Sequence, residues 1–431
     1  MALIHPQSQD ATKSELDVFL IPSTQSAIET NYELKLAPIS TLSASSPEIE
    51  FVIPGNDDYV DMSSLKLHVI GHLVKNDGTN VTTDPYITAA NVTTYNYAPA
   101  QYFLHTIFSS VEISLNGTRL TQAAPTYPYR AYLDVTLYTD KFAKDSHLYA
   151  AMYGERKNRC DRVSKSRSFD MYGALHGDIC QQGKFLINHL PVSIKLSRSP
   201  DSFGLFRTTG AEAPKLVIDS CHMYVKKYKL SPTTDRAINL ALESTPAKYF
   251  LTRTEVKTFQ IPTGGPSFSE DHVFTGLLPR RFVVGIVPTS AFNGDYTQDP
   301  YGFKHIHIND ICCYVDNTMI PSVAFKPDFT NDKYCREYYS LFVELNANTS
   351  HPSLSLSYSK FKDSTPLFAF NLSPDRSDGP ECGIVNPQKR GNVRLEFKCS
   401  QNTTQPYTLI IYAHYDSVIQ IDRDRQVQLS Y

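Results

Sequence analysis

Hydrophobic and polar residues alternate in short runs along the whole chain, and each run stops at turn-forming residues. Glu48–Ile53 alternates and ends at Pro54 and Gly55, and residues 111–115 alternate and meet Asn116-Gly117, a strong hairpin signal. A period of two residues is typical of strands with one buried face. The same reading predicts further strands over residues 65–74, 185–196, 216–228, 282–287, 311–315, 367–372, 393–397 and 407–421. The pattern therefore predicts a mostly β protein.

The strand pattern is interrupted near the middle of the chain. Ser231-Pro232 is typical of a helix start, and residues 237–242 are good helix formers with few β-branched side chains. We predict a short helical linker over residues 231–247. The segments on either side, 16–230 and 248–431, are then two domains, preceded by a flexible N-terminal arm over residues 1–15.

The two halves repeat one pattern with an offset of about 200 residues. Asn116-Gly117 corresponds to Asp316-Asn317, and each turn precedes a second strand, a proline-containing loop and a tyrosine-rich amphipathic helix. The strand ending at Gly71 corresponds in the same way to the strand containing Gly285. A propeller would need a repeat of about 40–50 residues. The fold class predicted is all-β, with two tandem jelly-roll sandwiches and short helices in the loops.

Composition narrows the class of protein. The 431 residues include 27 Tyr and 23 Phe but no Trp, and the net charge of −3 gives no basic excess for neutralising DNA. The eight cysteines lack the spacing of a disulfide framework or of a zinc-binding pair. The N-terminus does not resemble a signal peptide, and no run approaches about 18 apolar residues. We expect a protein made inside a cell and not secreted, with reduced cysteines and no membrane span.

Candidate catalytic and metal-binding chemistry is sparse. The sequence has no phosphate-binding loop, no GxSxG elbow and no HExxH motif. His305 and His307 alternate on a predicted strand and could share a metal ion, but no third ligand is evident. Asp57, Asp58 and Asp61 could bind a cation, although a solvated loop explains them better. We expect no catalytic residue, no cofactor and no metal.

Two charged segments allow more than one interpretation. Residues 156–167 are rich in Arg and Lys and lie near Tyr149 and Tyr153, so they could contact nucleic acid, although a solvated or inter-subunit loop fits better. The alternating charges of residues 422–425, placed on a strand, would put acids on one face and bases on the other. That arrangement suits pairing with a neighbouring chain. A solvated strand end explains the same charges equally well.

Several ordered blocks, from about Asp17 to Val427 and denser in the second half, carry a family resemblance. They lie at 19–25, 51–55, 278–285, 291–296, 326–329, 338–342, 367–375, 389–395 and 421–425. These blocks resemble the major capsid proteins of polintons (Mavericks) and adintoviruses. The residues taken as the family signature, with structural roles expected, are Pro54, Gly55, Leu278, Pro279, Arg280, Arg281, Asn293, Gly294, Asp328, Phe329, Tyr338, Tyr339, Asp422 and Arg423.

The resemblance implies a structural protein and not an enzyme. It implies two jelly rolls per chain and a homotrimer that forms a pseudo-hexameric, hexon-like capsomer, which tiles an icosahedral shell with neighbouring trimers. A penton single jelly-roll protein and minor capsid proteins would be its partners in the virion. The shell would enclose double-stranded DNA without sequence-specific binding. Two alternatives are a carbohydrate-binding or adhesive β-sandwich protein and a metal-dependent cupin-like enzyme.

Overall fold

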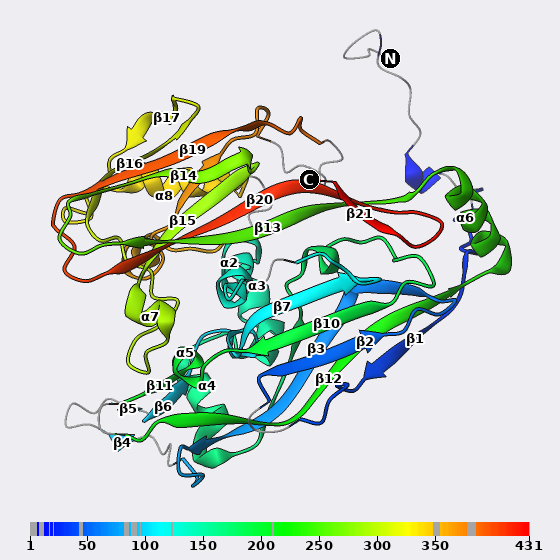
Figure 1. The fold of residues 1–431 in the computed structure, drawn as a ribbon, viewed down its shortest axis with the longest axis horizontal. Coiled ribbons are helices and arrows are strands. Elements are labelled where there is room, and N and C mark those ends of the chain that lie inside the picture. The colour runs from blue at the N-terminus through cyan, green and yellow to red at the C-terminus, as the bar shows by residue number, and fades with distance from the viewer. Residues whose placement is uncertain are drawn as a thin grey trace.

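The strands of the computed structural model form two sandwiches that lie side by side (Figure 1). The structure describes Gln7 and residues 13–16, 18–19, 21–42, 46–81, 86–87, 93–94, 96–121, 124–208, 211–347, 354–376 and 385–430. Each sandwich consists of two antiparallel sheets, as the predicted all-β class requires. Most of the predicted arm of residues 1–15 falls outside the described residues.

The first sandwich is built from eight main strands. One sheet has the order β1 (Ile28–Leu36), β12 (Pro214–Leu230), β3 (Tyr59–Lys75), β9 (Phe169–Ala174). The facing sheet has the order β2 (Glu48–Ile53), β10 (Val192–Arg198), β7 (Phe108–Leu115), β8 (Thr118–Arg119). Two small ribbons pair β6 (Tyr97–Pro99) with β11 (Leu205–Arg207) and β4 (Tyr86–Ile87) with β5 (Thr93–Thr94).

The second sandwich repeats this order strand for strand. One sheet runs β13 (Ala247–Ile261), β20 (Tyr407–Ile421), β15 (Arg281–Pro288), β18 (Phe368–Asn371), with β21 (Val427–Ser430) also on β20. The other runs β14 (Ser267–Leu277), β19 (Arg390–Cys399), β16 (Ile308–Val315), β17 (Thr318–Phe325). Eight main strands in two four-membered ladders, joined in the same sequence in both halves, are the arrangement of a duplicated jelly roll.

The predicted helices are present. The helix predicted near the middle of the chain is α6 (Pro232–Ser244), which begins where the Ser231 side chain accepts a hydrogen bond from the Thr234 backbone N–H. The hairpins β7–β8 and β16–β17 are each followed by a helix, which is α2 (Tyr127–Tyr138) in the first half and α8 (Cys335–Glu344) in the second. The shorter helical segments are η1 (Ser14–Leu16), α1 (Phe103–Thr106), α3 (Lys141–Lys144), η2 (His147–Ala151), α4 (Arg156–Val163), η3 (Ser164–Ser166), η4 (Asp178–Cys180), α5 (Asp201–Gly204), α7 (Thr289–Asn293) and α9 (Tyr358–Asp363).

Two strand predictions were wrong in part. The strand expected over 185–196 is only β10, because residues 185–191 form a loop that touches β3 through an isolated bridge from Leu186 to Val60. The strand expected to continue through residues 422–425 ends at Ile421. A tight turn follows it, closed by the bond from the Asp422 backbone N–H to the Gln426 carbonyl and by Arg425 at φ 62°.

Candidate functional site: the seam between the two sandwiches

The helix α2 lies between the two sandwiches, where it packs on β7 of the first and on β13 of the second (Figure 1). It is buried along almost its whole circumference, unlike a surface helix with one polar face. We call the seam the contact that α2, α1 and η4 make with β13, β15, β20 and the segment 292–303. Each hydrophobic core also takes residues from the other half, such as Leu251 in the first and Leu133 in the second.

Aromatic rings fill one part of the seam. Tyr132 of α2 stacks on Tyr301 with ring centroids 4.2 Å apart, and Tyr129 stacks on Phe292 at 5.5 Å. The Tyr301 hydroxyl is 2.7 Å from the hydroxyl of Thr106 in α1. These large rings bury apolar surface here, so the aromatic excess in the composition serves this contact as well as the sandwich cores.

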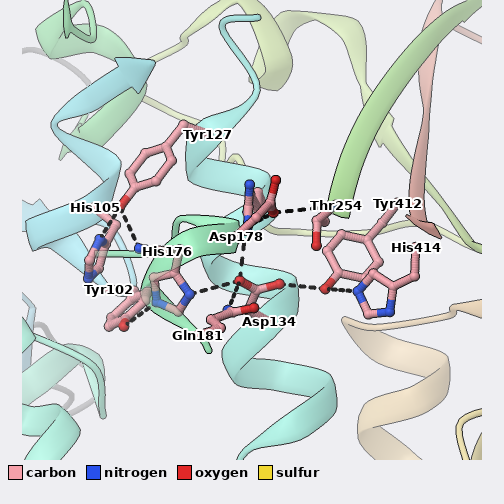
Figure 2. A network of polar contacts seen from close by, with 11 residues as sticks. Tyr102, His105, Tyr127, Asp134, His176, Asp178, Gln181, Thr254, Tyr412 and His414 are labelled. Carbon is pink, nitrogen blue, oxygen red and sulfur yellow. Dashed lines mark hydrogen bonds and ion pairs between the residues drawn. The ribbon is translucent and has the colours of Figure 1, made fainter. Parts of the chain in front are cut away.

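A polar network crosses the other part of the seam (Figure 2). The carboxylate of Asp134 in α2 lies 2.8 Å from His176 Nδ1, accepts a bond from Gln181 Nε2 at 3.2 Å, and accepts another from the Tyr412 hydroxyl. Tyr412 Oη is in turn 2.7 Å from Nε2 of His414, two residues along β20. The chain of contacts therefore runs from the loop after β9, through α2, to the outer face of β20.

An ion pair lies beside this network. Arg130 Nη2 is 2.5 Å from Asp178 Oδ1, and the same oxygen accepts the backbone N–H of Thr254 in β13 at 3.1 Å. All three groups are buried. Burial would lower the pKa of Arg130, but Asp178 and Asp134 raise it overall, so the guanidinium stays charged. Asp178 thus joins η4 and α2 of the first half to β13 of the second.

Burial sets the protonation of the seam histidines. Burial, with the neighbouring Arg281 adding to it, holds the pKa of His414 well below its ordinary value. Burial and the nearby His176 do the same to the pKa of His105 in α1. Burial by itself would raise the pKa of Asp134, but the hydrogen bond and the charge interaction with His176 lower this pKa overall. The seam at neutral pH therefore holds neutral imidazoles at His105 and His414 beside a charged carboxylate.

Four of the signature residues lie in or next to the seam on the side of the second sandwich, and two of them, Arg281 and Gly294, contact the first half. Arg281 lies over the ring of Tyr138 in α2, 5.2 Å from its centroid. Arg280 forms a buried ion pair with Asp416 at 2.7 Å. Asn293 ends α7, and Gly294 follows at φ 96°, where an added Cβ would lie 2.8 Å from the Ser202 side chain in α5. A side chain at Gly294 would therefore separate the two sandwiches at this point.

The other signature residues have local structural roles. Leu278 is buried beside Pro279 at the entry to β15, and Asp328 caps the turn that leads to α8. Phe329 is buried and stacks on Tyr334. Tyr338 donates a hydrogen bond to the Leu356 carbonyl at 2.8 Å, whereas Tyr339 is exposed. At the end of the first sandwich, the Pro54 carbonyl accepts the Lys227 ammonium, and Gly55 lies too close to the backbone of 189–191 for any Cβ.

The placement of His305 and His307 on a strand, on which a shared metal ion depended, is wrong. Both lie in a turn and not on a strand, with Ile306 and His307 at positive φ. The His305 ring stacks on Phe329 at 4.5 Å, and burial, followed by the neighbouring His307, lowers its pKa to about 4. Within the described residues, no group of three or more His, Cys, Asp or Glu side chains is placed to hold a metal ion.

The acidic loop and the charged turn contact their own chain. Asp58 accepts the Tyr32 hydroxyl at 2.6 Å, and Asp61 accepts from Ser63, while Asp57 lies 3.4 Å from His189. In the charged turn, Arg423 lies 3.6 Å from Glu243 of α6. Arg425, in the same turn, donates to both the backbone and the side-chain oxygen of Asn188. The turn therefore anchors the C-terminal hairpin to the first sandwich, and the strand-like alternation of acids and bases expected there is absent.

The basic segment 156–167 folds back on the first sandwich. Arg159 is buried and donates to the carbonyls of Pro99 and Gly154, and Arg162 donates to that of Tyr149 and pairs with Asp170. Two cations of the basic segment are therefore held by contacts within the chain.

In the part of the chain that the structure describes, no helix is long and apolar enough to cross a membrane. Seven cysteines in that part are free thiols.

Comparison with known proteins supports the fold. No protein-family model matches the chain. An uncharacterized protein of Caenorhabditis elegans is 24% identical over 419 residues, covering 93% of this chain and 97% of that protein. The mavirus major capsid protein is similar over 100% of this chain and 95% of its own, with a TM-score of 0.57 at 12% identity.

Two further solved structures give the same result. The Sputnik virophage structure is similar over 100% of this chain and 94% of its own (TM-score 0.58, 10% identity), and the PBCV-1 virus capsid over 96% and 99% (TM-score 0.60, 10% identity). These structural neighbours are double jelly-roll major capsid proteins of DNA viruses and virophages. The chain therefore has the double jelly-roll fold, as its sequence pattern predicted.

Proposed function

We propose that this chain is the major capsid protein of an icosahedral DNA virus or virus-like element, with a structural and non-enzymatic role. The observation that carries the proposal is the duplication: two jelly rolls of identical strand order, joined in one chain by the seam. The likeness to capsid structures over the whole length of the chain supports it. A double sandwich whose seam is largely buried also leaves its outer surfaces available for assembly.

The proposed assembly is a homotrimer. Three chains with two similar sandwiches each provide six similar units, which suits a pseudo-hexameric capsomer at a six-coordinated position of a shell. Such a unit does not fit a five-fold vertex, so a penton single jelly-roll protein is a proposed partner, together with minor capsid proteins and neighbouring trimers. The shell would enclose double-stranded DNA in the virion, with no sequence-specific contact from this chain.

Within the capsid proteins, we assign the chain to the polinton (Maverick) and adintovirus group. The ordered signature blocks, from Pro54-Gly55 to Asp422-Arg423, support this assignment. The relative of nearly equal length in Caenorhabditis elegans supports it too, because an animal homologue suits a capsid gene carried by a genomic element. We also propose that residues 16–230 and 248–431 are the two domains, with 231–247 as their linker.

Size and shape of the purified protein test the proposal. Expressed chain should behave in light scattering as a species of about three times 48.5 kDa. Negative-stain micrographs should show particles with a hexagonal outline. A stable monomer that does not assemble at high concentration would contradict the proposal, and a monomer that binds a glycan array would favour the carbohydrate-binding alternative.

A further inference from the structure

Lys227 lies on the buried face of β12. Cys221, Met223 and Val225 precede it at two-residue spacing, and all three are buried in the core of the first sandwich. Lys227 continues this row and is itself 0% exposed. A lysine is almost never fully buried unless its charge is paired, so the surroundings of its nitrogen call for an explanation.

The nitrogen of Lys227 meets two oxygens of the loop between β2 and β3. Nζ donates to the Pro54 carbonyl at 2.8 Å and to Oδ1 of Asn56 at 2.6 Å. Both acceptors are neutral groups, so these two hydrogen bonds supply no counter-charge. Burial lowers the pKa of Lys227, although the charge of Asp58 opposes this shift. The site therefore favours the neutral, nucleophilic amine more than water does.

A carboxylate lies on the other side of the same amide. Oδ2 of Asp58 accepts a hydrogen bond from Nδ2 of Asn56 at 3.0 Å and another from the Tyr32 hydroxyl of β1 at 2.6 Å. The backbone of this loop is fixed as well, because the Asn56 carbonyl accepts the His189 backbone N–H at 2.7 Å. The Asn56 amide thus has an amine against its oxygen and a carboxylate against its nitrogen.

We propose that Lys227 and Asn56 join in an intramolecular isopeptide bond, with Asp58 as the catalytic acid and base. Nζ is 2.6 Å from Oδ1, and a C=O bond is about 1.2 Å long, so Nζ lies within about 4 Å of Cγ of Asn56. Reacting atoms that are ready for attack are roughly 3–3.5 Å apart. A small movement of either side chain therefore brings the two atoms to reacting distance.

The reaction exchanges one amide for another and needs no oxidant, reductant or cofactor. The lone pair of the neutral Nζ attacks Cγ and forms the new C–N bond. Asp58 takes the proton that Nζ gives up and passes it to Nδ2, the bond from Cγ to Nδ2 breaks, and ammonia leaves. Asp58 returns to its starting charge. Asn56 is exposed, so the ammonia has a route to solvent.

The new bond ties β12 to the loop between β2 and β3. The two residues are 171 positions apart in the sequence, so the bond closes a long loop of the chain. A cross-link of this kind restricts the unfolded chain, as a disulfide does, but a reducing environment cannot break it. The inference concerns one chain by itself and does not depend on the proposed capsid function.

Mass spectrometry of the purified full-length chain tests the proposal. The denatured chain should be lighter than its sequence mass by about 17 Da, the mass of one ammonia. A tryptic digest should contain a branched peptide that joins Asn56 to Lys227 and is uncut after Lys227. If the chain keeps its full mass and gives two separate peptides, even when it is held at about pH 9 to deprotonate the amine, the proposal is overturned.

Variants of the two loop residues test their roles. Asn56→Ala removes the amide carbon that is attacked, so that chain should keep its full mass. Asn76→Ala is the matched control, since Asn76 is an exposed asparagine just beyond the far end of β3, and this variant should still lose ammonia. Asp58→Asn should slow the loss of ammonia by about a hundredfold or more. Equal rates in Asp58→Asn and the wild type would refute the role of Asp58.

A different reaction of Asn56 would lose the same mass. Asn56 precedes Asp57, and attack by the Asp57 backbone nitrogen would give a cyclic imide within one peptide. Lys227→Met separates the two reactions: it should keep its full mass, whereas an imide would still form in it. Loss of ammonia from Lys227→Met, or an unbranched light peptide from the wild type, would overturn the isopeptide bond. If circular dichroism shows that Lys227→Met is unfolded, the peptide map of the wild type decides alone.

Discussion

The ion pair between Arg130 and Asp178 lies at the seam, and Asp178 also bonds to β13 of the second sandwich, so truncation of Asp178 to alanine measures what these contacts contribute to stability. Asp178 accepts the Arg130 guanidinium at 2.5 Å and the Thr254 backbone N–H at 3.1 Å. Once the carboxylate is removed, the nearest remaining acid to the guanidinium is Asp134, at 3.9 Å from Nε. The variant therefore leaves a buried cation with a weakened counter-charge and a buried N–H with no acceptor from this side chain.

The expected loss follows from these contacts. Removing one partner of a buried pair costs about 3–5 kcal/mol, because the other charge stays out of water. The N–H of Thr254 adds to the cost, since an unmade buried hydrogen bond costs about 1–3 kcal/mol. We expect Asp178→Ala to lower the free energy of unfolding by at least about 3 kcal/mol. Replacing both partners, with Arg130→Met and Asp178→Leu, should cost less than Asp178→Ala alone, since no charge is then left unpaired.

Equilibrium unfolding in urea, followed by tyrosine fluorescence because the chain has no Trp, provides the measurement. Glu48→Ala is the control: it breaks an exposed ion pair with Lys195 at 2.8 Å, which contributes about 0–1 kcal/mol. A loss for Asp178→Ala no larger than that of the control would refute the reasoning, because the seam would then be held by its aromatic contacts alone.

Three further predictions concern pH, backbone and thiols. Acidification from about pH 7.5 to about 5 should lower the melting temperature, because His105 and His414 have pKa values far below 6.5 when folded and take up protons on unfolding. The stability that these neutral histidines contribute is complete above about pH 6.5 and is lost as the pH falls towards their folded pKa values. His414→Gln should flatten the dependence of melting temperature on pH, and an unchanged slope would contradict the assignment. Gly294→Ala should lower the free energy of unfolding by about 1–3 kcal/mol, more than Gly276→Ala does. Gly276 also has a positive φ, of 91°, but has open space around it, so equal losses would show that backbone strain alone matters. Cys335→Ser should remove one rapidly reacting thiol in native maleimide labelling counted by intact mass, and an unchanged count would be inconsistent with its exposure.

Local patterns predicted the elements that depend on local rules. The hairpin at Asn116-Gly117 lies between β7 and β8, where Asn116 and Gly117 both take positive φ. The linker α6 begins at its predicted cap. The predictions failed where a local pattern met a tertiary contact. His305 and His307 have the spacing of a strand, but the stacking of His305 on Phe329 holds that segment in a turn.

The seam had a weaker signal in the sequence. Tyr129 and Tyr132 belong to the tyrosine-rich helix that the repeat predicted, yet nothing in that helix shows which surface covers it. Asp134, Asp178 and Tyr412 come from distant parts of the chain, and their separations follow no motif. The signal that could have been noticed is the presence of Arg and Asp within an otherwise apolar helix pattern. Such residues are almost never fully buried unless they are paired, so they predict a partner elsewhere in the chain.

By itself, the sequence determined the all-β class and the duplicated strand order, because alternation, turn chemistry and repeated order are properties of neighbouring residues. Only the tertiary structure decided that α2 is covered along almost its whole circumference while α8 is not, and that Asp178, paired with Arg130, meets Thr254 across the seam. The physical reason is that burial depends on which surfaces meet in space. Two similar amphipathic helices therefore have different surroundings, one inside the chain and one at its outer side.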